Sequence, residues 1–188
     1  MGLFGKSKED KQEEWYTKGE TLLELGQYEE SITCFDKSLE INTKNIPTIA
    51  HAWYMKSQCF LAMHMFDESL TCCDEAIRLN PIPYIPMRCG ILLSLGKYDQ
   101  VVACCDEVIK LNSKDYSTLN TKGVALDELG RHEEAIVCYE EIINNAAQMS
   151  ESEQISNIWK NKGVSLKKLG REEEAEQCFA EAKKLDES

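Results

Sequence analysis

Apolar residues recur three or four positions apart along most of the chain, which is the spacing of one face of an α-helix. The first such face begins at Lys11 and carries Trp15 and Leu22, and a second begins at Tyr28. Gly26 lies between them, and glycine commonly ends a helix because it adopts positive φ without a Cβ penalty. The pattern therefore predicts a helix, a short glycine turn and a second helix, which together form an antiparallel hairpin.

The hairpin pattern occurs five times along the chain. The turn residue is glycine in every copy but the second, in the order Gly26, His64, Gly96, Gly130 and Gly170. Seven positions before it stands a small residue, in the order Gly19, Ser57, Cys89, Gly123 and Gly163. A larger apolar residue precedes that by four, in the order Trp15, Trp53, Ile85, Leu119 and Trp159. We expect the small residue where the two helices of a hairpin pass closest to one another.

These columns together resemble the tetratricopeptide repeat family, and the resemblance covers residues 12–186. It implies an all-α fold, a right-handed superhelical solenoid of five antiparallel helix-turn-helix hairpins. The expected repeats span about 12–45, 50–81, 82–114, 116–149 and 156–188, within a single domain over residues 11–188. Residues 1–10 have little to bury and are expected to form a flexible N-terminal tail. His64 and Cys89 depart from the family pattern, so the second and third repeats are the least regular.

Two prolines mark the third repeat. Pro83 and Pro86 fit only outside a helix or in its first turn. The first helix of this repeat is therefore expected to begin near Pro86, which leaves a notch in the array.

The fifth repeat differs from the others on the face that would meet a following repeat. Two columns there are apolar in repeats one to four, namely Ile32, Leu70, Val102 and Ile136, and Leu39, Ile77, Ile109 and Ile143. In the fifth repeat these positions are Glu176 and Lys183. Because a terminal repeat needs a polar outer face, we expect the array to end after five repeats.

Composition narrows the range of partners. The 188 residues carry a net charge of −12, which repels phosphate backbones and anionic membrane surfaces. Neither nucleic acid nor a membrane is therefore an expected partner, whereas a basic peptide, or an apolar one with basic flanks, is easier to accommodate. The sequence has no secretory signal and no apolar run of about 18 residues, so we expect a cytoplasmic protein.

Nine cysteines raise the question of disulfides or metal. Five of them form one column in the second helices, namely Cys34, Cys72, Cys104, Cys138 and Cys178. Equivalent positions in neighbouring hairpins lie roughly 10 Å apart, whereas the Cα atoms of a disulfide lie within about 7 Å and zinc ligands converge on one ion. We therefore expect small buried hydrophobic side chains, with no metal and no cofactor.

Catalytic motifs are missing from the sequence. Its three histidines belong to no metalloprotease-like motif, and there is neither a nucleophile elbow nor a phosphate-binding loop. We therefore predict no catalytic residue and no enzyme activity. A basic column does recur, as Lys18, Lys56, Arg88, Lys122 and Lys162. Its long side chains either cover the seam between helices, with the charge reaching water or a glutamate, or form a ladder for an acidic ligand.

In the resembled family, the first helices line a concave surface that binds an extended or helical peptide. The positions that match this surface here are Tyr16, Thr17, Glu20, Tyr54, Met55, Gln58, Met87, Asn120, Thr121, Val124, Lys160 and Asn161. Tyrosine and methionine suit adaptable contacts with a peptide. The alternative for Tyr16 and Tyr54 is that they pack between neighbouring repeats.

One branch of the family, the chaperone-binding carboxylate clamp, uses Lys and Asn in these columns. The early positions here are Tyr16, Glu20 and Met55, and only Lys160 and Asn161 match, so a co-chaperone of this kind is disfavoured. The sequence thus predicts a non-catalytic scaffold that binds a protein or peptide segment in a concave groove. The alternative is a structural module that self-associates as a homo-oligomer.

Overall fold

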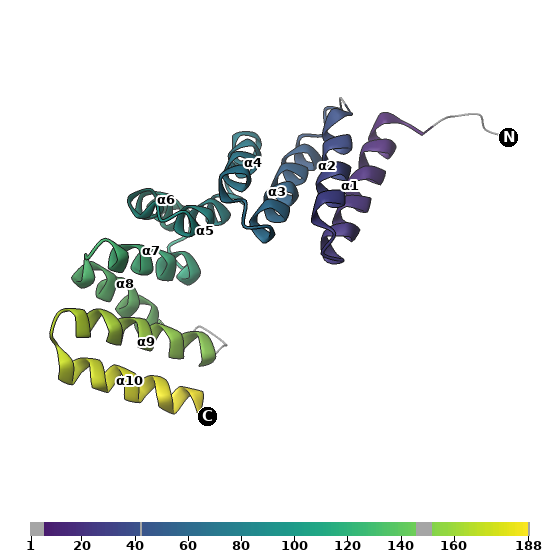
Figure 1. Cartoon of the computed structure of the whole chain (residues 1–188). Helices are drawn as coiled ribbons and strands as arrows, with labels where there is room; N and C mark the ends of the chain where they lie inside the picture. Colours follow the sequence, from purple (N-terminus) through teal and green to yellow (C-terminus); the bar gives the residue numbers. More distant parts are fainter. Residues whose placement is uncertain (1–5, 42, 146–151, 188) are drawn as a thin grey trace. The chain divides into compact units, whose positions relative to one another are not determined.

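The computed structural model describes residues 6–41, 43–145 and 152–187, and in this part of the chain it contains ten helices and no strand (Figure 1). The helices are α1 (Lys8–Glu24), α2 (Tyr28–Glu40), α3 (Ile46–Ala62), α4 (Phe66–Leu79), α5 (Ile85–Ser94), α6 (Tyr98–Leu111), α7 (Tyr116–Glu128), α8 (His132–Asn144), α9 (Ser152–Lys168) and α10 (Glu172–Asp186). The predicted all-α helical repeat fold is confirmed.

The chain divides into two compact units, Met1–Leu95 with α1 to α5 and Gly96–Ser188 with α6 to α10. In the first unit, α1 packs on α2 and α3 on α4, and α1 and α2 both contact α3. In the second unit, α7 packs on α8 and α9 on α10, which run side by side in Figure 1. Each unit therefore contains two helical hairpins and one further helix, α5 packed on α4 in the first unit and α6 packed on α7 in the second.

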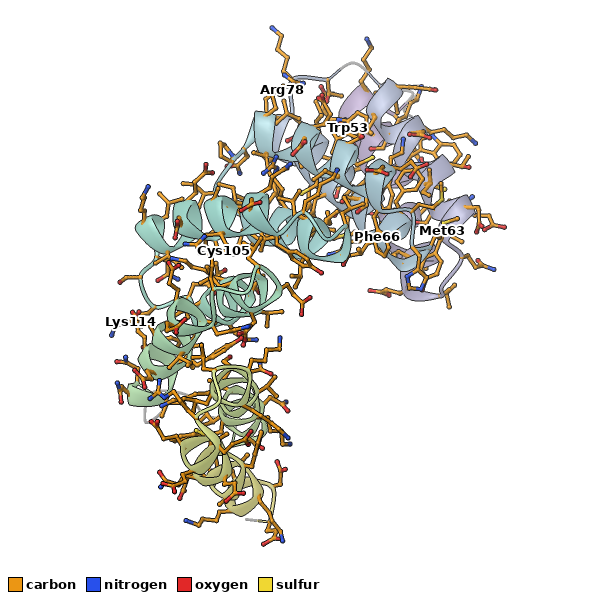
Figure 2. The ribbon with its side chains drawn as sticks, turned by 60° about the vertical axis from the view of Figure 1, so that its left-hand side comes forward. Trp53, Met63, Phe66, Arg78, Cys105 and Lys114 are labelled. Carbon is orange, nitrogen blue, oxygen red and sulfur yellow. The ribbon has the colours of Figure 1, made fainter. Side chains whose placement is uncertain are left out.

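The turns of the hairpins have the backbone that the glycine column predicts. Gly26, Gly130 and Gly170 have φ angles of 72°, 73° and 76°, in the left-handed region that glycine adopts readily. His64 occupies this column in the second repeat and has a φ of 58°. This turn, between Met63 and Phe66 (both labelled in Figure 2), therefore has the left-handed backbone of the glycine turns without a glycine.

In the first, fourth and fifth hairpins, where the small residue is glycine, it lies against a ring of the second helix. A Cβ on Gly19 would lie 2.7 Å from Phe35 Cε1, and a Cβ on Gly123 would lie 2.6 Å from Tyr139 Cε1. Carbon atoms at such distances overlap, so the helices approach this closely only because the side chain is absent. The interpretation of this column as the point of closest approach is confirmed for these hairpins.

The second hairpin uses polar contacts at the same point. The Ser57 hydroxyl donates to the carbonyl of Ser69 at 2.7 Å, and the Ser69 hydroxyl donates to the carbonyl of Ser57 at 2.8 Å. Each hydroxyl thus donates to a backbone carbonyl of the other helix. Both serines are buried away from water, where an unpaired hydroxyl would be costly.

The apolar columns of the second helices pack on the following repeat. Ile32 and Leu39 of α2 pack against a buried cluster that includes Ala52 and Cys59 of α3. The same two columns of the second unit also belong to buried clusters that include residues of the following helices. Their residues there are Val102, Ile109, Ile136 and Ile143. The corresponding residues of the fifth repeat, Glu176 and Lys183, are exposed.

Two helix starts refine the predicted boundaries. Helix α1 begins at Lys8 rather than Lys11, because the Ser7 hydroxyl accepts from the Asp10 amide while the Asp10 carboxylate accepts from the Ser7 amide. Residues 8–10 of the expected tail are therefore helical, and residues 1–5 lie outside the described part. Helix α5 begins at Ile85, directly before Pro86, where the proline pattern predicts its start.

A matched pair of alanine substitutions tests the close approach. We expect Gly123→Ala to lower the free energy of unfolding by about 1–3 kcal/mol, because the new methyl group displaces the fully buried Tyr139 ring. Gly90→Ala in α5 meets nothing within 4 Å, so the better helix propensity of alanine should stabilise the protein by up to about 1 kcal/mol. Urea unfolding measures both, and shifts of the same sign would contradict the assignment.

Candidate functional site

Four aromatic side chains gather on the first helices of the first unit. They are Tyr16 of α1, His51 and Tyr54 of α3, and Tyr84 directly before α5, and we call them the ring cluster. The rings of His51 and Tyr54 stack 5.6 Å apart with an angle of 9° between their planes, and Tyr54 and Tyr84 stack 5.0 Å apart. The Tyr16 ring lies 5.7 Å from that of His51. The cluster thus joins three segments that are distant in the sequence.

Hydrogen bonds fix one end of the ring cluster. The Tyr16 hydroxyl donates to Glu20 Oε1 at 2.6 Å, and His51 Nδ1 lies 2.6 Å from the same hydroxyl oxygen. An ionised carboxylate only accepts, so the single hydroxyl proton goes to Glu20 and His51 must donate from Nδ1. Burial and the neighbouring Glu20 carboxylate raise the pKa of Tyr16, so the phenol stays protonated.

A pocket of about 300 Å³ opens beside the ring cluster. We call it the α1–α3 pocket and define it by its lining residues, Glu13, Tyr16, Pro47, Thr48, His51, Asn80 and Tyr84. Glu13 is exposed and carries the one permanent formal charge among these residues, whereas Tyr16 and Tyr84 are each only 7% exposed. Burial raises the pKa of Tyr84 as well, so both phenols line the pocket in their neutral form.

The structure brings together only some of the predicted groove residues of the first unit. Tyr16, Glu20 and Tyr54 all belong to the ring cluster or contact it. Thr17 is exposed on α1 and lies outside the α1–α3 pocket. Met55 is half-buried and packs against the buried cluster around Phe35. Gln58 and Met87 are half-buried and do not line the pocket either.

The tyrosines follow both of the interpretations left open by the sequence. Tyr16 packs between the first two repeats, since it contacts Phe35 of α2 and His51 of α3. It also lines the α1–α3 pocket. Tyr54 is half-buried and stacks on Tyr84.

In the second unit, three of the predicted groove residues have polar partners within the protein. The Asn161 amide donates to the side-chain oxygen of Asn120 at 3.2 Å, which links α9 to α7. Lys160 pairs with Asp186 of α10 at 2.9 Å, and the Thr121 hydroxyl donates within α7. Val124 is half-buried. The two residues that match the carboxylate clamp, Lys160 and Asn161, thus both have protein partners.

Six of the seven residues that line the α1–α3 pocket were not predicted as site residues, namely Glu13, Pro47, Thr48, His51, Asn80 and Tyr84. His51 stands three positions before Tyr54, so the two share a face of α3, and this helical spacing was a usable signal. Tyr84 lies in the proline segment that predicted only a notch. Glu13 stands three positions before Tyr16 on α1, where it reads as an ordinary exposed acid.

The basic column forms ion pairs between repeats. From the second repeat on, each residue of the column pairs with an acidic residue on the second helix of the preceding repeat, as Lys56 with Asp36 at 2.5 Å, Arg88 with Asp74 at 2.8 Å, Lys122 with Asp106 at 2.6 Å and Lys162 with Glu140 at 2.8 Å. Lys18, in the first repeat, lies over the Trp15 ring instead. These side chains are partly buried, with Lys56 only 15% exposed, so their stems cover the seam between helices. The column therefore aligns neighbouring repeats, which favours the first of its two interpretations.

A second polar cluster surrounds Asp127 in the second unit. The Asp127 carboxylate accepts from His132 Nδ1 at 2.8 Å, from the Tyr139 hydroxyl at 3.0 Å and from the Ser165 hydroxyl at 2.7 Å. The cluster joins α7, α8 and α9. Serine and histidine each bind the same carboxylate, and no contact between them activates the hydroxyl as a nucleophile.

All nine cysteines are buried, including Cys105 of α6, which is labelled in Figure 2. Burial raises the pKa of the Cys72 thiol to about 11 and also raises the pKa of Cys59, Cys138 and Cys178. Within the described ranges, no three His, Cys, Asp or Glu residues come close enough to hold a metal ion. The expectation of small buried hydrophobic side chains agrees with this burial.

The described helices include none that is both long and apolar enough to cross a membrane.

Family comparisons agree with the helical hairpins. A model of the tetratricopeptide repeat matches residues 13–45, and a second model of this repeat matches residues 50–83, 116–148 and 156–188. These segments make up more than half of the chain, which therefore belongs to the tetratricopeptide repeat family. Four of the five predicted repeats correspond to a matched segment, and most of the third, at about 82–114, lies between two of them.

No curated protein matches the sequence. Among solved structures, MamA 41-end from Desulfovibrio magneticus RS-1 has a TM-score of 0.83 at 14% identity, with 95% of this chain and 96% of that chain covered. MamA from MSR-1 has a TM-score of 0.73 at 22% identity, with 94% and 97% covered. YrrB, described as a TPR protein with an unusual peptide-binding site, has a TM-score of 0.73 at 17% identity, with 91% and 84% covered. At these identities the likeness shows a shared fold.

Removal of the Asp127 carboxylate tests the polar cluster around it. Asp127→Ala leaves the Tyr139 hydroxyl and His132 Nδ1 without their acceptor, so we expect a loss of about 1–3 kcal/mol in the free energy of unfolding. Glu128→Ala, at the exposed neighbouring position, should change it by less than about 0.5 kcal/mol. Equal effects of the two substitutions in urea unfolding would show that the cluster does not hold the helices together.

Thiol reactivity tests the role of the cysteines. A pKa near 11 leaves about one hundredth of the thiolate present at the ordinary value of 9.0, and burial also blocks access. We therefore expect an aromatic disulfide reagent to label the native protein at least about a hundredfold more slowly than the urea-unfolded protein, in which all nine thiols should react. Fast labelling of several thiols in the native protein would point to a redox or metal site.

Proposed function

We propose that this protein is a non-catalytic scaffold that binds a segment of another protein on the surface formed by its first helices. Its membership in the tetratricopeptide repeat family supports this proposal, because such repeats present extended binding surfaces. The description of YrrB as a TPR protein with a peptide-binding site supports it by analogy. We also propose that the five repeats act as one array over residues 11–188 in the cytoplasm, where thiols stay reduced.

The observation that carries the proposal is the α1–α3 pocket. Its volume of about 300 Å³ lies at the lower end of the range for ligand sites, and suits one large side chain better than a drug-sized molecule. Aromatic rings line it, and tyrosines supply contact area at little cost in side-chain entropy. A peptide that lies along the first helices could therefore anchor one side chain there.

The polar clusters of the protein favour binding over catalysis. Tyr16 and His51 form a hydrogen-bonded chain that ends on Glu20, and burial keeps the Tyr16 phenol protonated. Asp127 holds three helices together through its own partners. Neither cluster pairs a nucleophile with a general base, which is the arrangement that hydrolytic chemistry needs.

Selection from a displayed library of random peptides tests the proposal. Peptides enriched on the wild-type protein would be synthesised, and their dissociation constants measured by fluorescence anisotropy. Thr48→Arg fills the α1–α3 pocket with a long side chain, so we expect it to weaken binding by about tenfold or more. Thr71→Arg, at an exposed position of α4, introduces the same side chain away from the pocket and should leave binding unchanged.

Two results would contradict the proposal. One is that no peptide is enriched on the wild-type protein, and the other is that the two arginine variants bind the peptides equally well. Light scattering addresses the alternative of a self-associating module. A monomer whose mass is independent of concentration would exclude that alternative, whereas a concentration-dependent mass would favour it.

A further inference from the structure

We infer that the α1–α3 pocket receives a basic side chain, the guanidinium of an arginine or the ammonium of a lysine in the bound peptide. This inference rests on the proposed function, and it names the chemistry of the side chain that the pocket selects. Charge, ring faces and hydrogen-bonding capacity support it separately.

The formal charges at the pocket are negative. Glu13 lines it, and the Glu20 carboxylate lies 2.6 Å from the hydroxyl of Tyr16, another lining residue. No lysine or arginine is among the lining residues, and Lys56 of α3 is engaged with Asp36. The net charge of −12 adds a field of the same sign. A cation therefore gains electrostatic energy on entering the pocket, whereas a carboxylate or phosphate loses it.

Aromatic rings provide the second contribution. Tyr16, His51 and Tyr84 line the pocket, and Tyr54 stacks behind Tyr84 with the ring centroids 5.0 Å apart. The negative face of a tyrosine ring attracts ammonium and guanidinium groups, most strongly where water is partly excluded. Guanidinium is planar and weakly hydrated, so it can also stack on such rings. A neutral apolar side chain would gain contact area but not this attraction.

The hydrogen-bonding capacity of the pocket points to a donor. Because the Tyr16 hydroxyl proton goes to Glu20, His51 donates from Nδ1, and in the tautomer with that single ring proton its Nε2 is an acceptor. The Glu13 carboxylate accepts as well, and the side-chain amide of Asn80 can accept through its oxygen as well as donate through its nitrogen. Lysine and arginine side chains have only donors, so they complement this set of acceptors. The preference is opposite to that of the carboxylate clamp, in which basic residues hold an acidic group.

Peptide libraries with one fixed central residue test the inference. The libraries would carry Arg, Lys, Glu or Leu at that position between random flanks, and each would be selected on the full-length protein. We expect binders from the Arg and Lys libraries at least about tenfold more often than from the Glu or Leu library. Replacing the fixed arginine of a selected peptide by citrulline, which keeps the shape but removes the charge, should weaken binding by about tenfold.

Variants of the protein identify the pocket as the place where the basic side chain binds. Glu13→Gln removes the carboxylate that lines the pocket, at an exposed position where folding is not at risk. It should lower the affinity for the Arg peptide about threefold to tenfold. Glu24→Gln makes the same change at an exposed site near the other end of α1 and should leave binding unchanged. Tyr84→Phe keeps the ring and should retain binding, whereas Tyr84→Leu should lose it about tenfold, with circular dichroism to confirm folding.

The outcomes separate this inference from the proposed function. Suppose that peptides are selected and Thr48→Arg blocks their binding, but neither citrulline nor Glu13→Gln weakens it. The scaffold proposal then stands, and the inference that the pocket receives a basic side chain is wrong. If the Glu or Leu library yields binders as readily as the Arg and Lys libraries, the inference is overturned too. If none of the four libraries yields a binder, both the inference and the proposed function fail.

Discussion

The contact between a glycine and a ring is the constraint on which three of the hairpins depend. At Gly19 and Gly123 the backbone of the first helix lies directly against a ring of the second, with no space for even one methyl group. Such a contact fixes how far apart the helices lie and how they are rotated about their axes. The rotation in turn decides which side chains face the core and which remain on the outer face of the first helix. The surface that is free to bind a partner is thus determined inside the hairpin.

Contacts between repeats then place neighbouring first helices beside each other. Ile32 and Leu39 bury apolar surface against α3, and this burial supplies most of the free energy that holds the first two repeats together. The Lys56–Asp36 ion pair is partly exposed, so it contributes little energy but favours one alignment of α3 on α2. With α1 and α3 aligned in this way, the Tyr16 hydroxyl reaches His51. The candidate site is therefore a product of packing between repeats, and no single hairpin contains it.

The sequence predicted the hairpins, their turns and the buried cysteines, because each of these depends on spacing within about 40 residues that repeats along the chain. It even located the second turn at His64, since the other copies fixed the position. The pocket could be predicted only in part. Of its lining residues only Tyr16 was expected from its column, whereas the predicted Glu20 contacts the ring cluster and the predicted Tyr54 belongs to it, without either lining the pocket. Tyr84 was missed because it belongs to no repeating column, and only the folded chain brings it to His51 and Tyr54. The sequence also left open what the basic column binds, because its acidic partners lie on the preceding repeat and are brought close only by folding.

The position of the pocket follows from the irregularity of the chain. Pro83 keeps the segment before α5 out of a helix, and the non-helical backbone allows Tyr84 to turn onto the rings of α3. A regular repeat would continue its helix through this position and direct the side chain elsewhere. The Cys73 thiol donates to the Tyr84 carbonyl at 3.7 Å, which holds the irregular segment against α4. Natural proteins depart from an ideal local pattern mainly at functional sites. Here the departure adds a third aromatic segment to the surface formed by α1 and α3. The same segment that interrupts the repeat thus lines the pocket through Asn80 and Tyr84. A change that restored helical structure there would take the Tyr84 ring out of the pocket.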